Sequence, residues 1–231
     1  MISDSIENRI LHEDNHIIIV NKCAGEIIQT DKTGDITLSD VLKQYIKIRD
    51  NKPGNVFIGV VHRLDRPVSG AVIFAKTSKA LARLNNMFKH GNVHKTYFAI
   101  VKNKPQIEED TLIHNLIRNE KINKSFICEK PLSNAKLARL RYKLAGQSNT
   151  YFLMEIELMT GRHHQIRCQM AAIGCPIKGD LKYGYQRSNS NGGISLHARK
   201  IEFIHPVNNN QINITAPFPK NDLWDCFNVK K

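Results

Sequence analysis

The chain has 231 residues, 41% of them hydrophobic, which is enough for one large or two small domains with a packed core. Its 34 Lys and Arg residues against 21 Asp and Glu residues give a net charge of +13, which favours a polyanionic partner, nucleic acid above all. Five scattered cysteines without a CxxC spacing argue against a zinc ribbon and a disulfide framework. The polar start argues against a signal peptide and the short apolar runs against a membrane span, so we expect a cytoplasmic protein.

The first hundred residues predict strands that alternate with amphipathic helices. Residues 15–21 and 71–75 are short apolar runs typical of buried strands, and residues 93–101 predict a third. Apolar residues recur at helical spacing over 38–46, with Thr37 as the expected N-cap. Ser78 is the expected N-cap of a second helix, which carries an apolar face ending at Phe88.

The rest of the chain predicts mainly strands, at residues 138–144, 152–158, 196–204 and 212–215, with a short helix ended by Gly174. Arg139, Arg141 and Lys143 share one strand face, which is either a phosphate-contacting surface or simply solvated. Residues 102–136 are polar and charged, so we interpret them as a mobile insertion. The strands come in hairpin-like runs, and the fold class we predict is mixed α+β on a largely antiparallel sheet.

Two stretches carry the chemistry, and the first is VHRLDRPVSG at residues 61–70. Asp65 lies between Arg63 and Arg66, with Pro67 and Gly70 to form a turn. A carboxylate near cations stays ionised, as a nucleophile or general base requires, and the cations suit a phosphodiester substrate. Taken alone, such a cluster is more often a structural ion pair, and composition does not decide between the two.

The second stretch, residues 160–184, places Arg162, His163, His164, Gln165 and Arg167 at the start of a helix, where arginines and helix N–H groups favour anions. His163, His164 and Cys168 raise the question of a metal. Adjacent residues point about 100° apart on a helix, so the two histidines are poorly placed to share an ion. We therefore expect no metal site.

These stretches resemble the RluA-like pseudouridine synthase family. Residues 62–70 (HRLDRPVSG) are similar to its HRLDxxTSG motif, and residues 161–169 and 174–184 to its GRxHQIRxH and GxPIxGDxxYG motifs. Residues 12–25, 95–101 and 196–206 resemble its first strand and turn, its KxYxAxV strand and its closing LHAxxLxFxHP segment. The ordered motifs span about residues 10–217, which implies one catalytic domain over 1–231 with no accessory RNA-binding domain before it.

The resemblance implies a role for each matching residue. Asp65 is the catalytic aspartate, Tyr97 stacks on the target base, and Arg167 pairs with the aspartate. Leu196 lines the uracil pocket, and Arg63 enters the space left by the displaced base. RNA contacts are further expected from His62, Arg162, His164 and Gln165. Val68, Gln169 and Cys23 depart from the family's usual Thr, His and Pro.

The implied reaction breaks the C1′–N1 bond of uridine and rejoins the turned base through C5, so no cofactor is expected. The implied partner is a ribosomal or transfer RNA stem-loop, bound by a monomer. One alternative is a non-catalytic RNA-binding protein on the same fold. Another is a metal-dependent hydrolase using the histidines and Asp180, although we expect Asp180 to brace a turn.

Overall fold

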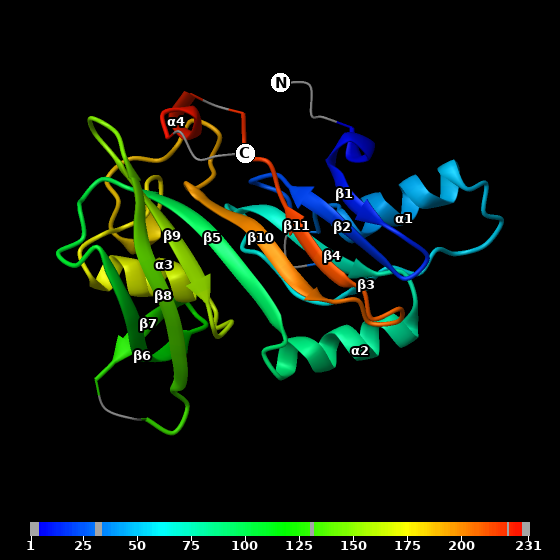
Figure 1. Cartoon of the computed structure of the whole chain (residues 1–231), viewed down its shortest axis with the longest axis horizontal. Coiled ribbons are helices and arrows are strands. Elements are labelled where there is room, and N and C mark those ends of the chain that lie inside the picture. The colour runs from blue at the N-terminus through cyan, green and yellow to red at the C-terminus, as the bar shows by residue number, and fades with distance from the viewer. Residues whose placement is uncertain (1–4, 31–33, 130–131, 221, 228–231) are drawn as a thin grey trace.

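The computed structural model describes residues 5–30, 34–129, 132–220 and 222–227, and its eleven described strands form one sheet (Figure 1). Strand order is β1-β2-β4-β10-β5-β9-β8-β6-β7, with β3 also on β4 and β11 on β10. The strands are β1 Ile10–Glu13, β2 Ile17–Lys22, β3 Gly59–Val60, β4 Ser69–Ala75, β5 Val93–Val101, β6 Glu109–Asn119, β7 Lys124–Cys128, β8 Lys136–Gln147, β9 Phe152–Leu158, β10 Leu196–Ile204 and β11 Gln211–Thr215. The described pairs are antiparallel except β4 with β10, so the predicted fold class is confirmed.

The helices are α1 Leu38–Arg49, α2 Ser78–Lys89, α3 Gln165–Ala172 and α4 Asp222–Asp225, with short 3₁₀ turns at Ile6–Arg9 and Leu181–Tyr183. Thr37 caps α1 as predicted, since its side chain accepts a hydrogen bond from the backbone N–H of Asp40. The predicted cap of α2 was wrong by one residue, because Thr77 rather than Ser78 accepts from the N–H of Ala80. Among the described residues, no helix is both long and apolar enough to cross a membrane.

The strand β2 is covered on both faces. Ile18 and Val20 pack in one cluster with Leu42 of α1, whereas Ile17 and Ile19 pack in another cluster with the helix α2. Successive strand residues point to opposite faces, so α1 and α2 cover opposite faces of this half of the sheet. The helix α3 packs beside β6, β7 and β8 in the other half (Figure 1).

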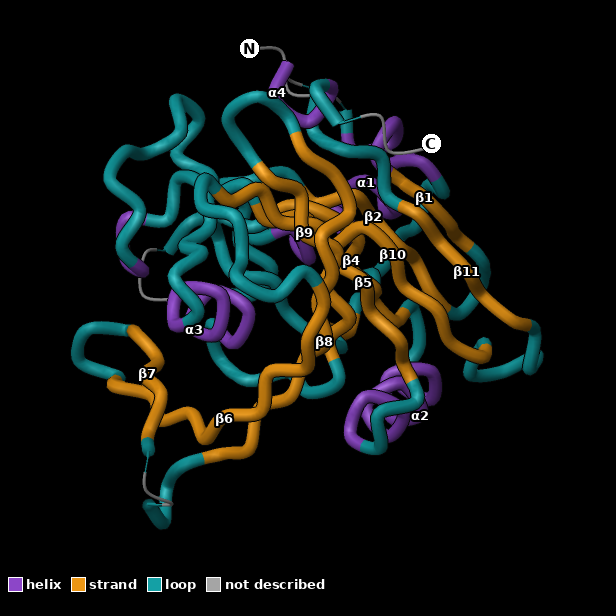
Figure 2. Tube along the Cα trace, turned by 60° about the vertical axis from the view of Figure 1, so that its left-hand side comes forward, coloured by secondary structure: helices purple, strands orange, loops and turns teal. Residues whose placement is uncertain are grey.

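The interpretation of residues 102–136 as a mobile insertion was wrong. This segment holds β6 and β7, and β6 pairs with β8 over eight residues, so the hairpin continues the sheet. Figure 2 shows the hairpin extending away from the central strands. On the exposed face of β8, Arg141 pairs with Glu109 and Lys143 with Glu155, which favours the solvated reading of that face.

Candidate active site

Asp65 lies in the loop between β3 and β4, and the last residue of β2 holds this loop from below. The Lys22 side chain is buried, and its Nζ donates to the carbonyl oxygens of Val68 at 2.6 Å and Arg66 at 3.1 Å. The loop turns at Asp65, whose carbonyl accepts from the N–H of Val68 at 3.0 Å. Burial lowers the pKa of Lys22 to about 8. The loop is therefore fixed by one buried ammonium.

Gly70 of the VHRLDRPVSG motif allows two strands to approach closely and is not itself part of a turn. Gly70 is already part of β4, with φ at +119°, and a Cβ there would overlap the backbone of Ala198 in β10. A glycine is needed because L side chains rarely adopt this φ. The parallel pairing of β4 with β10 places the Asp65 loop beside β5 and the cavity described below.

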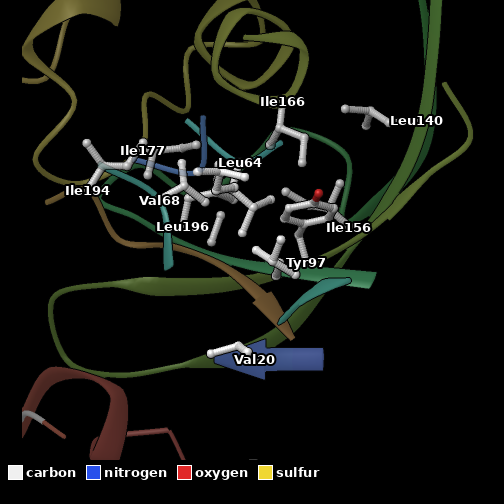
Figure 3. Close-up of a cluster of buried hydrophobic side chains, with 14 of the residues drawn as sticks. Val20, Leu64, Val68, Tyr97, Leu140, Ile156, Ile166, Ile177, Ile194 and Leu196 are labelled. Atoms are coloured by element: carbon white, nitrogen blue, oxygen red, sulfur yellow. The ribbon is translucent and has the colours of Figure 1, made fainter. Parts of the chain in front are cut away.

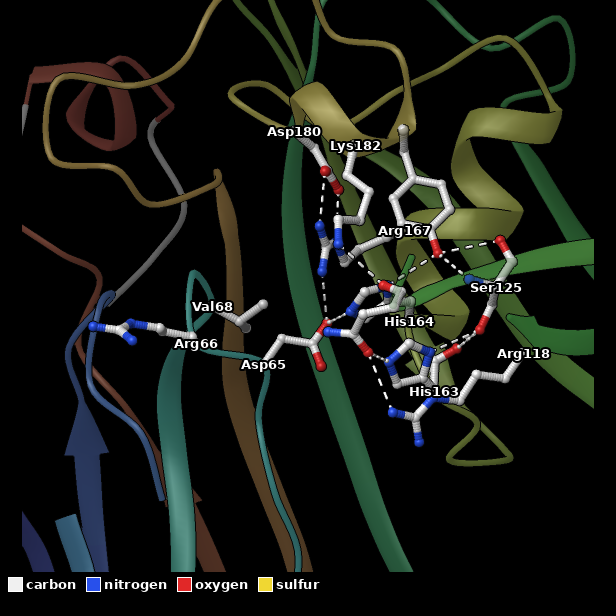
Figure 4. A network of polar contacts seen from close by, with 12 residues as sticks. Asp65, Arg66, Val68, Arg118, Ser125, His163, His164, Arg167, Asp180 and Lys182 are labelled. Carbon is white, nitrogen blue, oxygen red and sulfur yellow. Dashed lines mark hydrogen bonds and ion pairs between the residues drawn. The ribbon is translucent and has the colours of Figure 1, made fainter. Parts of the chain in front are cut away.

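Arg167 in the first turn of α3 binds the Asp65 carboxylate from the other half of the sheet. Its Nη1 donates to Asp65 Oδ2 at 3.0 Å (Figure 4). Its Nε and Nη2 bind the two carboxylate oxygens of buried Asp180 at 2.7 and 2.8 Å. Among the described residues, nothing donates a hydrogen bond to the second Asp65 oxygen, Oδ1. One Asp65 oxygen is therefore bound by the protein, and the other accepts no hydrogen bond from the described residues.

His164 completes the surroundings of Asp65 as a neutral group. Its Nε2 lies 3.5 Å from Asp65 Oδ2, and its Nδ1 lies 3.1 Å from the Tyr183 hydroxyl. Burial, reinforced by the charge of Arg167, lowers the pKa of His164 to about 2. The Tyr183 hydroxyl also lies 3.2 Å from the carbonyl oxygen of Ser125, so its one proton serves either that carbonyl or Nδ1, and this choice sets the tautomer of the neutral imidazole.

The expectation that the two histidines diverge on a helix was wrong. His164 is the N-cap of α3, with a left-handed φ of +51°, and His163 precedes it. Their rings stack with centroids 3.8 Å apart because neither residue has helical geometry. No group of three His, Cys, Asp or Glu side chains in the described parts of the chain is placed to hold a metal ion.

A cavity of about 650 Å³ opens beside the Asp65 carboxylate and is lined by Tyr97 and Leu196. Tyr97 on β5 lies opposite Ala198 of β10 and Ile156 of β9. Figure 3 shows its ring among aliphatic side chains, and only 7% of the residue is exposed. Burial raises the pKa of Tyr97, and the negative charge of Asp65 adds to this, so the phenol stays neutral. The cavity therefore offers one apolar wall and one carboxylate.

The remaining predicted residues also line this cavity, but two have polar groups occupied by the protein. His62 accepts the N–H of Ile73 at Nε2 and stacks on Phe88, and burial lowers its pKa to about 3. The Gln165 amide oxygen accepts from Thr160 and from the backbone of Arg162. The lining residues with exposed guanidinium groups are Arg63, Arg118 and Arg162.

The expectation that Arg63 and Arg66 lie beside the Asp65 carboxylate was wrong. Arg66 pairs with Asp35 at 2.8 Å instead, and within the described chain Arg63 makes no hydrogen bond or ion pair with the carboxylate. Charge spacing along VHRLDRPVSG also missed Lys22 and the two groups that support Arg167. Asp180 does lie in a turn, as expected, but its side chain binds Arg167, and the Tyr183 ring lies 5.1 Å from that guanidinium. The motif resemblance was the signal that could find them.

Comparisons with known proteins point to one family. The family model of RNA pseudouridylate synthase matches residues 16–172. An uncharacterized RNA pseudouridine synthase of Bacillus subtilis is 32% identical over 91% of this chain and 68% of its own length. The ribosomal large subunit pseudouridine synthase C of Rickettsia bellii is 34% identical over the same shares. Among solved structures, human RNA pseudouridylate synthase domain containing 4 superimposes with a TM-score of 0.78 at 22% identity, covering 93% of this chain and 90% of that one.

Proposed function

The chain belongs to the RNA pseudouridylate synthase family, a family of isomerases, and from this premise we propose that Asp65 is the catalytic carboxylate that converts uridine to pseudouridine in structured RNA. One observation carries the proposal. The Asp65 side chain is held by Arg167 at one oxygen, while the other faces a cavity walled by Tyr97 and Leu196. An ionised carboxylate, a flat apolar wall and a supporting cation are what this isomerisation requires.

In the proposed reaction, the C1′–N1 bond breaks, the uracil turns in the cavity, and C5 bonds to C1′. The proton on C5 is replaced by one on N1, so atoms and electrons balance without an oxidant or reductant. Asp65 either attacks C1′ or removes the proton from C2′, and both routes need its charged form. The Arg167 guanidinium, with Nη1 at 3.0 Å, places a positive charge beside the Asp65 carboxylate in the partly buried site.

A uridine inside a helix or loop must first leave its stack, which costs a few kcal/mol. Stacking on Tyr97 would return about 1–3 kcal/mol, and Arg63 at the cavity rim would occupy the vacated space. The net charge of +13 supports binding of the surrounding phosphates. Names of relatives that refer to the ribosomal large subunit make ribosomal RNA our first choice over transfer RNA. A single catalytic domain, a monomeric state and a cytoplasmic location stay predictions.

The test is the isosteric change Asp65→Asn, which removes the charge but keeps the side-chain shape. We expect pseudouridine formation to fall about a thousandfold or more, as for other essential active-site carboxylates, while RNA binding survives. Bulk RNA from cells that lack the protein is incubated with the wild type or a variant, and carbodiimide labelling then measures the pseudouridine formed. Asp50→Asn, at the end of α1, is the control and should keep full activity. Full activity of Asp65→Asn, or no conversion by the wild type, would contradict the proposal.

A further inference from the structure

A second groove lies next to the cavity at Asp65 and shares four lining residues with it. Its volume is about 620 Å³, which is within the range of pockets that hold small ligands. Arg118, Gly161, Arg162 and His163 line both spaces. The other lining residues come from the hairpin and from the start of β8: Leu116, Ile117, Glu120, Ser125, Asn134 and Lys136. We call this space the hairpin groove.

Strand register places two cations on the wall of the hairpin groove. Leu116 of β6 lies directly opposite Lys136 of β8, so their side chains share one face of the sheet. Arg118 is two residues along from Leu116 and therefore points to the same face. Both cations are exposed, and Arg162 faces them from the loop before α3. Against these three cations, the groove carries one carboxylate, that of Glu120.

The cationic groups are available to a ligand. Arg162 uses Nε to bind the carbonyl of Leu137 at 2.9 Å, and its two terminal nitrogens make no hydrogen bond to the part of the chain that is described. Lys136 makes no side-chain hydrogen bond or ion pair there either. Arg118 gives one N–H to Asn123 at 3.2 Å. An arginine fixed at Nε presents its remaining donors in a fork that matches a phosphate.

The wall of the groove is already braced. The Ser125 hydroxyl donates to the carbonyl of His163 at 2.7 Å, and its N–H donates to the Tyr183 hydroxyl at 2.8 Å. Lys182 binds the carbonyls of Ile122 and Asn123 at the hairpin turn. Figure 4 shows Ser125, His163 and Arg118 beside the Asp65 network. The same contacts therefore join the hairpin to the catalytic site, and little order has to be gained on binding.

From these contacts, we propose that the hairpin groove binds the RNA strand adjoining the target uridine, with Arg118, Lys136 and Arg162 contacting its phosphates. The inference rests on the proposed function, because the groove shares lining residues with the cavity that would receive the uridine. Charge favours RNA over an acidic peptide, since the whole chain carries +13. Asn134, which is exposed, adds an amide group of the kind that recognises ribose.

The experiment compares Lys136→Ala and Arg118→Ala with Lys47→Ala, which removes an exposed cation from α1 at the opposite end of the molecule (Figure 1). The probe is a short fluorescent single-stranded RNA, with binding measured by anisotropy between about 50 and 200 mM salt. We expect each groove variant to bind about tenfold more weakly. The magnitude of the slope of log affinity against log salt should fall by about one. Raising the salt from about 50 to 200 mM should then weaken binding by a variant about threefold less than binding by the wild type. Lys47→Ala should behave as the wild type.

Ultraviolet cross-linking of the same RNA to wild-type protein should mark peptides from residues 112–136. The proposal would be overturned if the groove variants bound RNA with the same affinity and salt slope as Lys47→Ala, or if the cross-links were confined to other peptides. Pseudouridine formation by the wild type on bulk RNA is scored separately. Conversion without any dependence of binding on Lys136 rejects the groove alone. Binding that depends on Lys136 without any conversion leaves the groove standing and rejects the isomerase.

Discussion

At the scale of single residues, the active site is a chain of charges in which each member positions the next. Asp180 is 1% exposed and holds Arg167 by two hydrogen bonds, which leaves one guanidinium nitrogen for Asp65. Asp65, with a side chain 29% exposed, stands at the boundary between this buried pair and the cavity. The carboxylate at the exposed end of this series of charges is therefore the one that a substrate can reach, and the buried pair fixes its direction.

Substitutions of Tyr97 test whether its aromatic ring or its hydroxyl contributes to activity. Tyr97→Phe keeps the flat surface, so we expect it to retain most of the activity. Tyr97→Ala removes that surface, and with it a stacking energy of about 1–3 kcal/mol, which is a factor of about 5 to 150 in rate or affinity. Single-turnover assays of pseudouridine formation measure both variants. Equal losses in the two would contradict the stacking role.

Substitution of Asp180 tests whether its carboxylate positions the Arg167 guanidinium. Asp180→Asn removes one charge from a buried pair, and we expect unfolding stability to fall by about 3–5 kcal/mol. The single-turnover rate should also drop at saturating RNA, because a guanidinium with a looser hold orients Asp65 less well. RNA affinity should stay unchanged, and a variant with normal rate but lower stability would show that Asp180 only supports the fold. Asp110→Asn on exposed β6 is the matched control.

At the scale of elements, the strand β2 ends at the catalytic loop through Lys22. Lys22→Met keeps the buried length of the side chain but leaves the carbonyls of Val68 and Cys23 without the ammonium donor, whereas the Arg66 carbonyl keeps the N–H of Gly25. Each unsatisfied buried acceptor costs about 1–3 kcal/mol. We expect a loss of activity greater than that of Lys43→Met on α1, measured by single-turnover conversion at a temperature where both variants are folded. Equal activity would mean that the loop keeps its shape without the ammonium.

Sequence patterns predicted most elements and missed one hairpin for a physical reason. The strands β2, β4 and β9 are buried on one or both faces, so their apolar patterns predicted them. The strands β5, β9 and β10 begin and end where predicted. The strand β6 has only two buried residues, Leu112 and Leu116, so its apolar periodicity is too weak to read. Its pairing with β8 holds it in the sheet, and pairing is not a local property of sequence.

The site divides in the same way. Asp65 and Arg167 are separated by 102 positions, so no local pattern could join them, and only the motif resemblance did. Val68, where the family usually has Thr, is 2% exposed in the core, and its carbonyl rather than its side chain braces the loop through Lys22. Gln169 is fully buried and donates to His114 and to the carbonyl of Leu112, which links α3 to β6.

At the scale of the whole molecule, the catalytic groups come from both halves of one sheet. The Asp65 loop follows from β3 and β4, whereas Arg167 and the hairpin groove belong to α3 and β6–β8. The parallel pair β4–β10 and the antiparallel pair β10–β5 join the halves. Opening between the halves would separate Asp65 from Arg167, so activity should require the intact sheet.

Buried neutral histidines make this assembly sensitive to acid. Burial lowers the pKa of His62 to about 3, of His164 to about 2 and of His197 to about 4, from an ordinary value of 6.5. Between those values and 6.5, the unfolded chain binds more protons than the folded one, so stability falls as pH falls through this window, by up to about 1.4 kcal/mol per pH unit for each histidine. Denaturant unfolding at about pH 7, above this window, and at about pH 6 and pH 5, inside it, measures the slope. We expect His62→Gln to flatten it and His94→Gln, on an exposed residue, to leave it unchanged. A wild-type stability that does not fall between these pH values would show that the three histidines accept protons without loosening the site that joins the two halves.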